Sequence, residues 1–271
     1  MLFLLIISCD KISEPYMTDL NHGTDTGTSH GSTVLIEDFT GHYCGNCPAA
    51  HEILIQLLDK YKERLVPLCI HAGFFAGTTF GENYTTDYTT PEGNVLFDYF
   101  NSPDPPVGLV NRTPSENPVL TKDTWDAAIA EQLKKPAPVH INIQNTFDVE
   151  TRKLGVMTEV IILKDTDLAI SISVYLSEDS LISGQLDYNA VPSDIPDYIH
   201  RYVFRASLNG TFGEVISTGK IYKGDILEKN YFMTLPPEFN EKHCNVIVFV
   251  SDDETKEVLH VHQNNQFFLI E

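Results

Sequence analysis

The hydrophobic pattern of the chain changes character at about residue 136. Before that point, continuous apolar runs are interleaved with segments whose apolar residues recur at helical spacing, at residues 34–39, 44–64, 65–71, 91–100 and 121–135. Continuous apolar strands separated by helices are typical of a parallel sheet that is covered on both faces. We therefore expect an α/β domain at residues 33–135.

After the stiff hinge Pro136-Ala137-Pro138, the period of the pattern becomes two. Apolar and polar residues alternate along residues 139–144 and 170–177, and five further short apolar segments are separated by turn signals such as Asn209-Gly210. Short strands with this spacing indicate an antiparallel sandwich of the immunoglobulin-like type. We expect this all-β domain at residues 136–271.

The N-terminal residues carry a different pattern. Residues 1–9 are an apolar run that ends in Ser8-Cys9, and residues 10–32 are polar and rich in glycine, serine and threonine. An apolar run that ends in a small residue and a cysteine is typical of a bacterial lipoprotein signal, although a basic segment before the run is missing. We expect a truncated signal at residues 1–9 with lipidation at Cys9, and a flexible tether at residues 10–32. A buried structural run is the alternative.

Composition narrows the classes of partner. The 271 residues include 38 acidic and 18 basic side chains, for a formal net charge of −20. Such a charge argues against nucleic acid or an anionic membrane surface as a direct partner. Five cysteines are too few for a disulfide-dense scaffold. Cys69 and Cys244 lie in or beside apolar runs, and we expect both to be small buried hydrophobic residues.

The segment Cys44-Gly45-Asn46-Cys47-Pro48 separates the first apolar run from the following helix. Proline is tolerated only in the first helical turn, so we expect the helix to begin near Cys44. The N-terminal end of a helix stabilises a thiolate, and a second cysteine one turn away is the arrangement that thiol–disulfide exchange uses. Two alternatives are a permanent structural disulfide and a zinc site that includes His51, for which the sequence offers no fourth ligand.

The order of apolar strand, Asp38, Tyr43 and Cys-x-x-Cys at a helix start resembles the thioredoxin superfamily. The resemblance implies that an exposed Cys44 attacks and that Cys47 resolves the mixed disulfide. It also implies that Asp38 is a buried acid near Cys47 that accepts its proton, and we expect burial to raise the pKa of Asp38. Pro106, which precedes the apolar run at residues 107–110, would be the cis proline that holds a substrate backbone beside the sulfurs.

Three segments together, residues 40–48, 107–112 and 200–214, resemble the twenty-eight-kilodalton outer membrane protein family. Its members are lipoproteins of Gram-negative bacteria with a thioredoxin-like domain followed by a β-rich domain. The resemblance implies an outer membrane protein, lipid-anchored through Cys9 and either periplasmic or surface-exposed. Protein thiols or disulfides of the envelope are the expected partners.

The expected function is thiol–disulfide exchange, through the catalytic residues Cys44, Cys47, Asp38 and Pro106. The alternative is a non-enzymatic surface binding or adhesion lipoprotein in which the disulfide is structural. We expect no bound cofactor and no metal ion, because neither a phosphate-binding loop nor a complete set of metal ligands stands out in the sequence.

Overall fold

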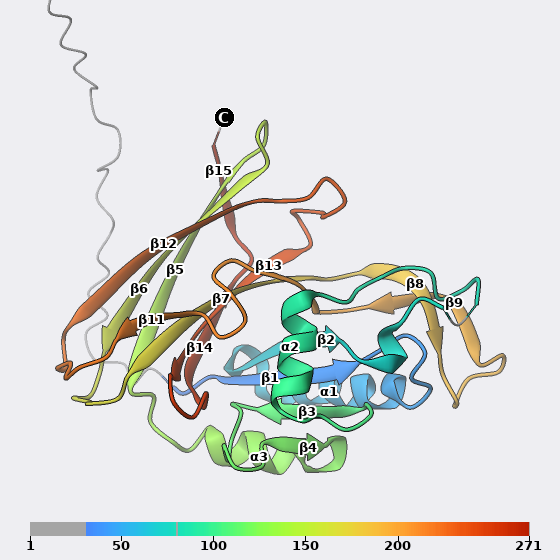
Figure 1. Ribbon diagram of the computed structural model, residues 1–271, viewed down its shortest axis with the longest axis horizontal. Helices are drawn as coiled ribbons and strands as arrows, with labels where there is room; N and C mark the ends of the chain where they lie inside the picture. Colours follow the sequence, from blue (N-terminus) through green and yellow to red (C-terminus); the bar gives the residue numbers. More distant parts are fainter. Residues whose placement is uncertain (1–30, 80, 271) are drawn as a thin grey trace, which may run out of the picture. The chain divides into compact units, whose positions relative to one another are not determined.

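The computed structural model describes residues 31–79 and 81–270 (Figure 1). Cys9 and the predicted tether as far as residue 30 lie outside the described residues. The fold is mixed α/β and consists mostly of β-sheet. Its first part contains β1 (Val34–Thr40), α1 (Cys47–Tyr61), β2 (Leu65–His71), α2 (Pro91–Tyr99), β3 (Val107–Val110), β4 (Val119–Thr121) and α3 (Trp125–Gln132).

The second part is built from strands. These are β5 (Val139–Asp148), β6 (Lys153–Ile162), β7 (Ile170–Glu178), β8 (Leu181–Leu186), β9 (Asp194–His200), β10 (Val203–Ser207), β11 (Glu214–Ser217), β12 (Ile226–Thr234), β13 (Cys244–Asp252), β14 (Val258–Asn264) and β15 (Phe267–Ile270). Among the described residues, no helix is both long enough and apolar enough to cross a membrane.

One nine-stranded sheet contains strands from both sides of residue 136. Its order is β14-β13-β7-β10-β2-β1-β3-β4, and β11 pairs with β7. The two parts meet where Val203 of β10 pairs with Cys69 of β2, and the Cys69 N–H donates a hydrogen bond to the Tyr202 carbonyl at 2.8 Å. The boundary expected at residue 135 therefore separates helical from β-only segments within a shared sheet, and the division into two domains stays a prediction.

The parallel pairing of β1 with β2 sets the register on which the candidate site depends. Asp38 lies opposite Cys69, and Thr40 lies opposite His71. Both strands are buried, since α1 and α3 cover one face and α2 the other. The continuous apolar runs of the sequence have this physical origin: each face of these strands must be apolar.

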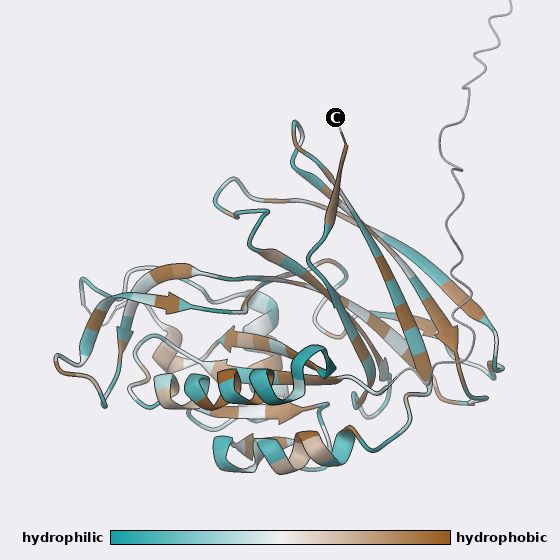
Figure 2. Cartoon of the chain, turned by 180° about the vertical axis from the view of Figure 1, so that it is seen from behind, coloured by the Kyte–Doolittle hydropathy of each residue, from teal (hydrophilic) through white to brown (hydrophobic). Residues whose placement is uncertain are grey.

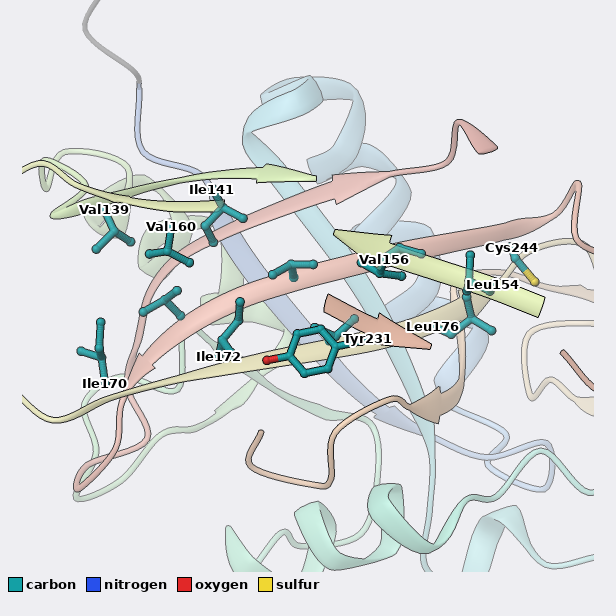
Figure 3. Packing of buried hydrophobic residues seen from close by; sticks show 14 of the residues in the cluster. Val139, Ile141, Leu154, Val156, Val160, Ile170, Ile172, Leu176, Tyr231 and Cys244 are labelled. Atoms are coloured by element: carbon teal, nitrogen blue, oxygen red, sulfur yellow. The ribbon is translucent and has the colours of Figure 1, made fainter. Parts of the chain in front are cut away.

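The remaining strands form a four-stranded sheet, β12-β6-β5-β15, and a separate hairpin of β8 and β9. Brown and teal bands alternate along the long strands in Figure 2, as expected for strands with one buried face. The inward side chains of β5, β6 and β12 pack against one face of β7 and β13 (Figure 3). On β7, Val174 faces this core, whereas the neighbouring Tyr175 packs into a second core on the other face of the sheet.

A fully buried ion pair connects β1 with the loop after β3. The Arg112 guanidinium donates from Nε and Nη2 to the two carboxylate oxygens of Glu37, at 2.7 and 2.6 Å. Arg112 is 1% exposed and Glu37 is 0% exposed. Burial alone would lower the pKa of Arg112, but the adjacent carboxylate outweighs that effect and raises it.

Two expected helix boundaries were wrong. The first helix begins at Cys47 and not near Cys44, because the preceding residues form turns in which the Cys44 N–H donates to Gly41 O and the Cys47 N–H donates to Cys44 O. The helix expected at residues 121–135 is shorter, Trp125–Gln132, because residues Lys122–Thr124 form a 3₁₀ turn.

Candidate functional site

Cys44 and Cys47 form a disulfide at the start of α1. Their Cα atoms are 5.4 Å apart. Pro48 occupies the first turn of the helix, where its missing N–H costs no hydrogen bond. Both cysteines are only 3% exposed. The expectation that Cys44 is an exposed sulfur is therefore wrong for this conformation.

The β8–β9 hairpin covers the disulfide. The Leu186 N–H donates to His42 O at 2.8 Å and the Tyr188 N–H donates to Gly45 O at 2.9 Å. The Gln185 side-chain amide donates to Cys44 O at 3.1 Å. A Cβ on Gly45 would lie 2.5 Å from the Tyr188 ring. The hairpin can pack this closely only because residue 45 is a glycine.

The Pro105–Pro106 pair lies beside the disulfide. The Pro105–Pro106 peptide bond is cis and immediately precedes β3. The Cys44 Sγ lies 3.5 Å from the Pro105 carbonyl oxygen. Cys44 is therefore the sulfur that faces the backbone of this proline pair.

Asp38 is buried on β1, with 2% of its surface exposed. Its Oδ1 has no hydrogen-bond partner in the described part of the chain. Burial raises the pKa of Asp38 well above its usual value, in the direction expected from the sequence. The carboxyl group lies close to His51 and Cys69, with the potential ligand atoms of the three within 4.8 Å of one another.

A cavity of about 20 Å³ extends from Cys47 between α1, β2 and the hairpin. Its walls include His51, Cys69, His71 and His200. Burial lowers the pKa of His51 and of His200 to about 4, and lowers that of His71 strongly, so all three rings are neutral near pH 7. His71 is 3% exposed, and neither of its ring nitrogens has a hydrogen-bond partner among residues 31–79 and 81–270.

Sequence reasoning did not find His71 or His200 as site residues. The available signal for His71 was its position two residues after Cys69, which places both side chains on the same face of one strand. His200 ends β9, a strand that the periodicity did not predict. Cys69 and Cys244 are buried free cysteines, as expected from their apolar surroundings.

The sequence profile of the family "Outer membrane protein Omp28" matches residues 94–266, which is more than half of the chain. This match places the chain in a class of envelope proteins that are located at the outer membrane. The chain belongs to the Omp28 family of outer membrane proteins. No curated protein matches it.

Solved structures similar to the chain include HBP35 of Porphyromonas gingivalis, with 18% identity, a TM-score of 0.66, and coverage of 88% of this chain and 76% of that chain. A structural-genomics protein from Agrobacterium tumefaciens has 11% identity, a TM-score of 0.51 and coverage of 88% and 95%. A domain of the outer membrane lipoprotein Omp28 from Porphyromonas gingivalis has 20% identity, a TM-score of 0.34 and coverage of 51% and 93%. The first two likenesses show a shared fold.

Proposed function

We propose that this lipoprotein exchanges disulfides with protein thiols of the cell envelope through Cys44 and Cys47. We further propose that residues 33–135 form a thioredoxin-like domain and residues 136–271 an immunoglobulin-like sandwich. The observation that carries the proposal is the placement of the Cys44–Cys47 disulfide at the start of α1, with the Cys44 Sγ 3.5 Å from the Pro105 carbonyl oxygen. Asp38, buried on the adjacent strand, supports it.

Exchange transfers two electrons in two displacements. A partner thiolate attacks the Cys44 Sγ, the bond from Cys44 to Cys47 breaks, and Cys47 leaves as a thiolate. A second partner thiolate then attacks the partner sulfur of the mixed disulfide and releases Cys44. The partner leaves with a new disulfide, and the pair has gained two electrons and takes up two protons. The same two steps in the reverse order reduce a partner disulfide.

Each neighbouring group has a role in these steps. The Pro105–Pro106 backbone lies against Cys44, which makes Cys44 the sulfur that a docked partner meets. Cys47 lines the inner cavity and is the leaving and resolving sulfur. The raised pKa of Asp38 suits a carboxyl group that gives a proton to the Cys47 thiolate and takes it back during resolution.

The β8–β9 hairpin is the element that must move for a partner to enter. Hydrogen bonds from Gln185, Leu186 and Tyr188 tie it to the Cys-x-x-Cys loop. Its exposed side chains include large apolar ones, with Ile182 67% exposed and Val191 99% exposed. We propose that a partner binds these residues and displaces the hairpin from the disulfide. The hairpin thus controls access to the sulfurs.

The reduction potential of the Cys44–Cys47 couple tests the proposed function. The full chain is equilibrated in glutathione or dithiothreitol redox buffers, and the free thiols are counted by mass spectrometry after alkylation. We expect a potential within the range of exchange proteins, roughly −120 to −270 mV. A value below about −300 mV, where structural disulfides lie, contradicts disulfide exchange. Cys244→Ser removes a buried free thiol outside the Cys-x-x-Cys motif and should leave the potential unchanged.

A binding or adhesion lipoprotein is the second candidate function. The observation in its favour is that both cysteines are 3% exposed beneath a hairpin whose Tyr188 is 65% exposed and Val191 99% exposed. In this case the disulfide holds the loop that supports the hairpin, and the apolar hairpin binds the partner. A potential below about −300 mV is the outcome that would favour this function over exchange.

The lipid anchor is a separate prediction. If Cys9 carries the acyl chains, Cys9→Ser should move most of the protein from the membrane fraction to the soluble fraction, because buried acyl chains supply the attachment energy. Cell fractionation followed by immunoblotting measures the distribution, with Cys244→Ser as the control that stays in the membrane. Undiminished membrane association of Cys9→Ser would refute lipidation at this residue.

A further inference from the structure

Three residues with different ligand chemistry meet beneath the disulfide. Asp38 and Cys69 are paired neighbours on β1 and β2. His51 lies four residues after Cys47 on α1, so its side chain lies on the same face of the helix as that cysteine. One potential ligand atom from each of Asp38, His51 and Cys69 lies within 4.8 Å of the other two.

The polar atoms of this cluster are not satisfied by the protein. Asp38 Oδ1 and His51 Nε2 are both buried without a hydrogen-bond partner among the residues that the structure describes. Asp38 is 2% exposed and Cys69 is 3% exposed, so bulk water does not replace the missing partners. Because buried polar atoms without partners are costly, their presence on two residues of a cluster whose potential ligand atoms lie within 4.8 Å of one another indicates a ligand.

We propose that Asp38, His51 and Cys69 bind one zinc ion. Zinc at about 2.0–2.3 Å from each ligand atom requires these atoms to lie roughly 3.3–3.7 Å apart. The present separations of up to 4.8 Å must therefore shorten by about 1 Å when zinc binds. Cys69 binds as the thiolate, and its proton passes to solvent.

The adjacent cavity provides the fourth position. Its volume of about 20 Å³ is enough for one water molecule. His71 and His200 line the same cavity and can accept or donate hydrogen bonds to a zinc-bound water. Three protein ligands with an open fourth position are typical of zinc sites that bind water or a substrate.

The donor set and the charges both favour zinc. One sulfur, one nitrogen and one oxygen donor do not suit calcium or magnesium, which bind through oxygen. A carboxylate and a thiolate neutralise the two positive charges, so the buried complex has no net charge. Arg201 also lines the cavity, but its guanidinium is paired with Asp179 at 3.3 Å.

This site differs from the zinc site considered from the sequence, which combined Cys44 and Cys47 with His51. Those two sulfurs are joined in the disulfide and are not thiolates. The new site uses Cys69 in their place and goes beyond the proposed function. Asp38 binds zinc as a carboxylate, so it acts as the proton donor to Cys47 only in the zinc-free chain. Its test can be made with the disulfide closed, so failure of zinc binding and failure of disulfide exchange give separate results.

Zinc and cobalt titrations test the site directly. The full chain carrying Cys9→Ser, without an affinity tag, is oxidised, treated with a chelator and titrated with zinc by calorimetry. We expect one equivalent to bind with a dissociation constant below about 1 μM. Cobalt in place of zinc should give the visible bands of a tetrahedral site and a thiolate-to-cobalt charge-transfer band. His22 and His30 of the N-terminal segment cannot produce that band.

Matched variants assign the ligands. Cys69→Ser and His51→Gln should each weaken zinc binding by more than about 100-fold, which is the upper range for loss of an outer-shell partner. Cys244→Ser removes the other buried free cysteine and should bind as wild type does. The site is refuted if the parent chain binds no zinc, if cobalt gives no thiolate band, or if a folded Cys69→Ser binds zinc equally well. Should Cys69→Ser fail to fold, the cobalt spectra of the parent and of Cys244→Ser decide.

Discussion

Replacing Cys44 by serine is expected to abolish exchange with a protein disulfide, whereas replacing Cys47 by serine is expected to trap a mixed disulfide. Cys44 lies against the Pro105 carbonyl, where a docked partner would meet it. Cys47 lies at the wall of the cavity between α1, β2 and the hairpin. Without Cys47 the mixed disulfide has no resolving thiol, so the partner stays attached. Non-reducing electrophoresis and mass spectrometry of the trapped species measure both outcomes.

Alkylation of the reduced protein tests independently whether Cys44 is the attacking sulfur. Iodoacetamide should modify Cys44 before the other thiols, because thiolates react and burial keeps competing thiols protonated. Burial raises the pKa of Cys69 well above its usual value and that of Cys244 to about 12. Cys244→Ser should leave the reactivity of Cys44 unchanged. Exchange that survives Cys44→Ser would remove this residue from the mechanism and favour the binding function.

The β-strands that were predicted correctly are those whose burial follows from the apolar residues within the strand itself. β2 spans Leu65–His71 as expected, because both of its faces are covered and every position is buried. β8 and β9 were not predicted, because the hairpin contains Gly184, Pro196 and exposed residues with no regular alternation. Its position depends on bonds to His42 and Gly45, more than a hundred residues earlier. Periodicity within a window holds no information about such contacts.

The same distinction applies to the site. Cys44, Cys47 and Pro106 could be found as candidates because a short motif and a proline before an apolar run are visible along the chain. The convergence of His51 and Cys69 on Asp38 results from the register of two parallel strands and from the packing of α1 against them. Neither is a property of a sequence segment. Cys69 was expected only to be a buried hydrophobic residue, and its burial alone gave no indication of its neighbours.

The Glu37–Arg112 ion pair was also invisible in the sequence, and it leads to the largest expected effect on stability. Arg112→Met should lower the free energy of unfolding by about 3–5 kcal/mol, because Glu37 would then be a buried charge without a partner. Arg112 also lies over the rings of Phe100 and Phe249, at 5.4 and 5.0 Å from their centres. Methionine retains much of this apolar contact, so the loss measures mainly the unpaired carboxylate.

Urea unfolding of the oxidised chain measures this effect, and two further variants identify its cause. Lys60→Met breaks a surface pair with Asp126, in which the two side chains are 54% and 53% exposed, and should leave the free energy of unfolding nearly unchanged. The double variant Glu37→Leu with Arg112→Met should recover much of the loss, because removing both charges also removes the cost of burying them. If Arg112→Met alone unfolds within about 1 kcal/mol of wild type, water must reach Glu37 in the variant, and the pair is not the closed contact described here.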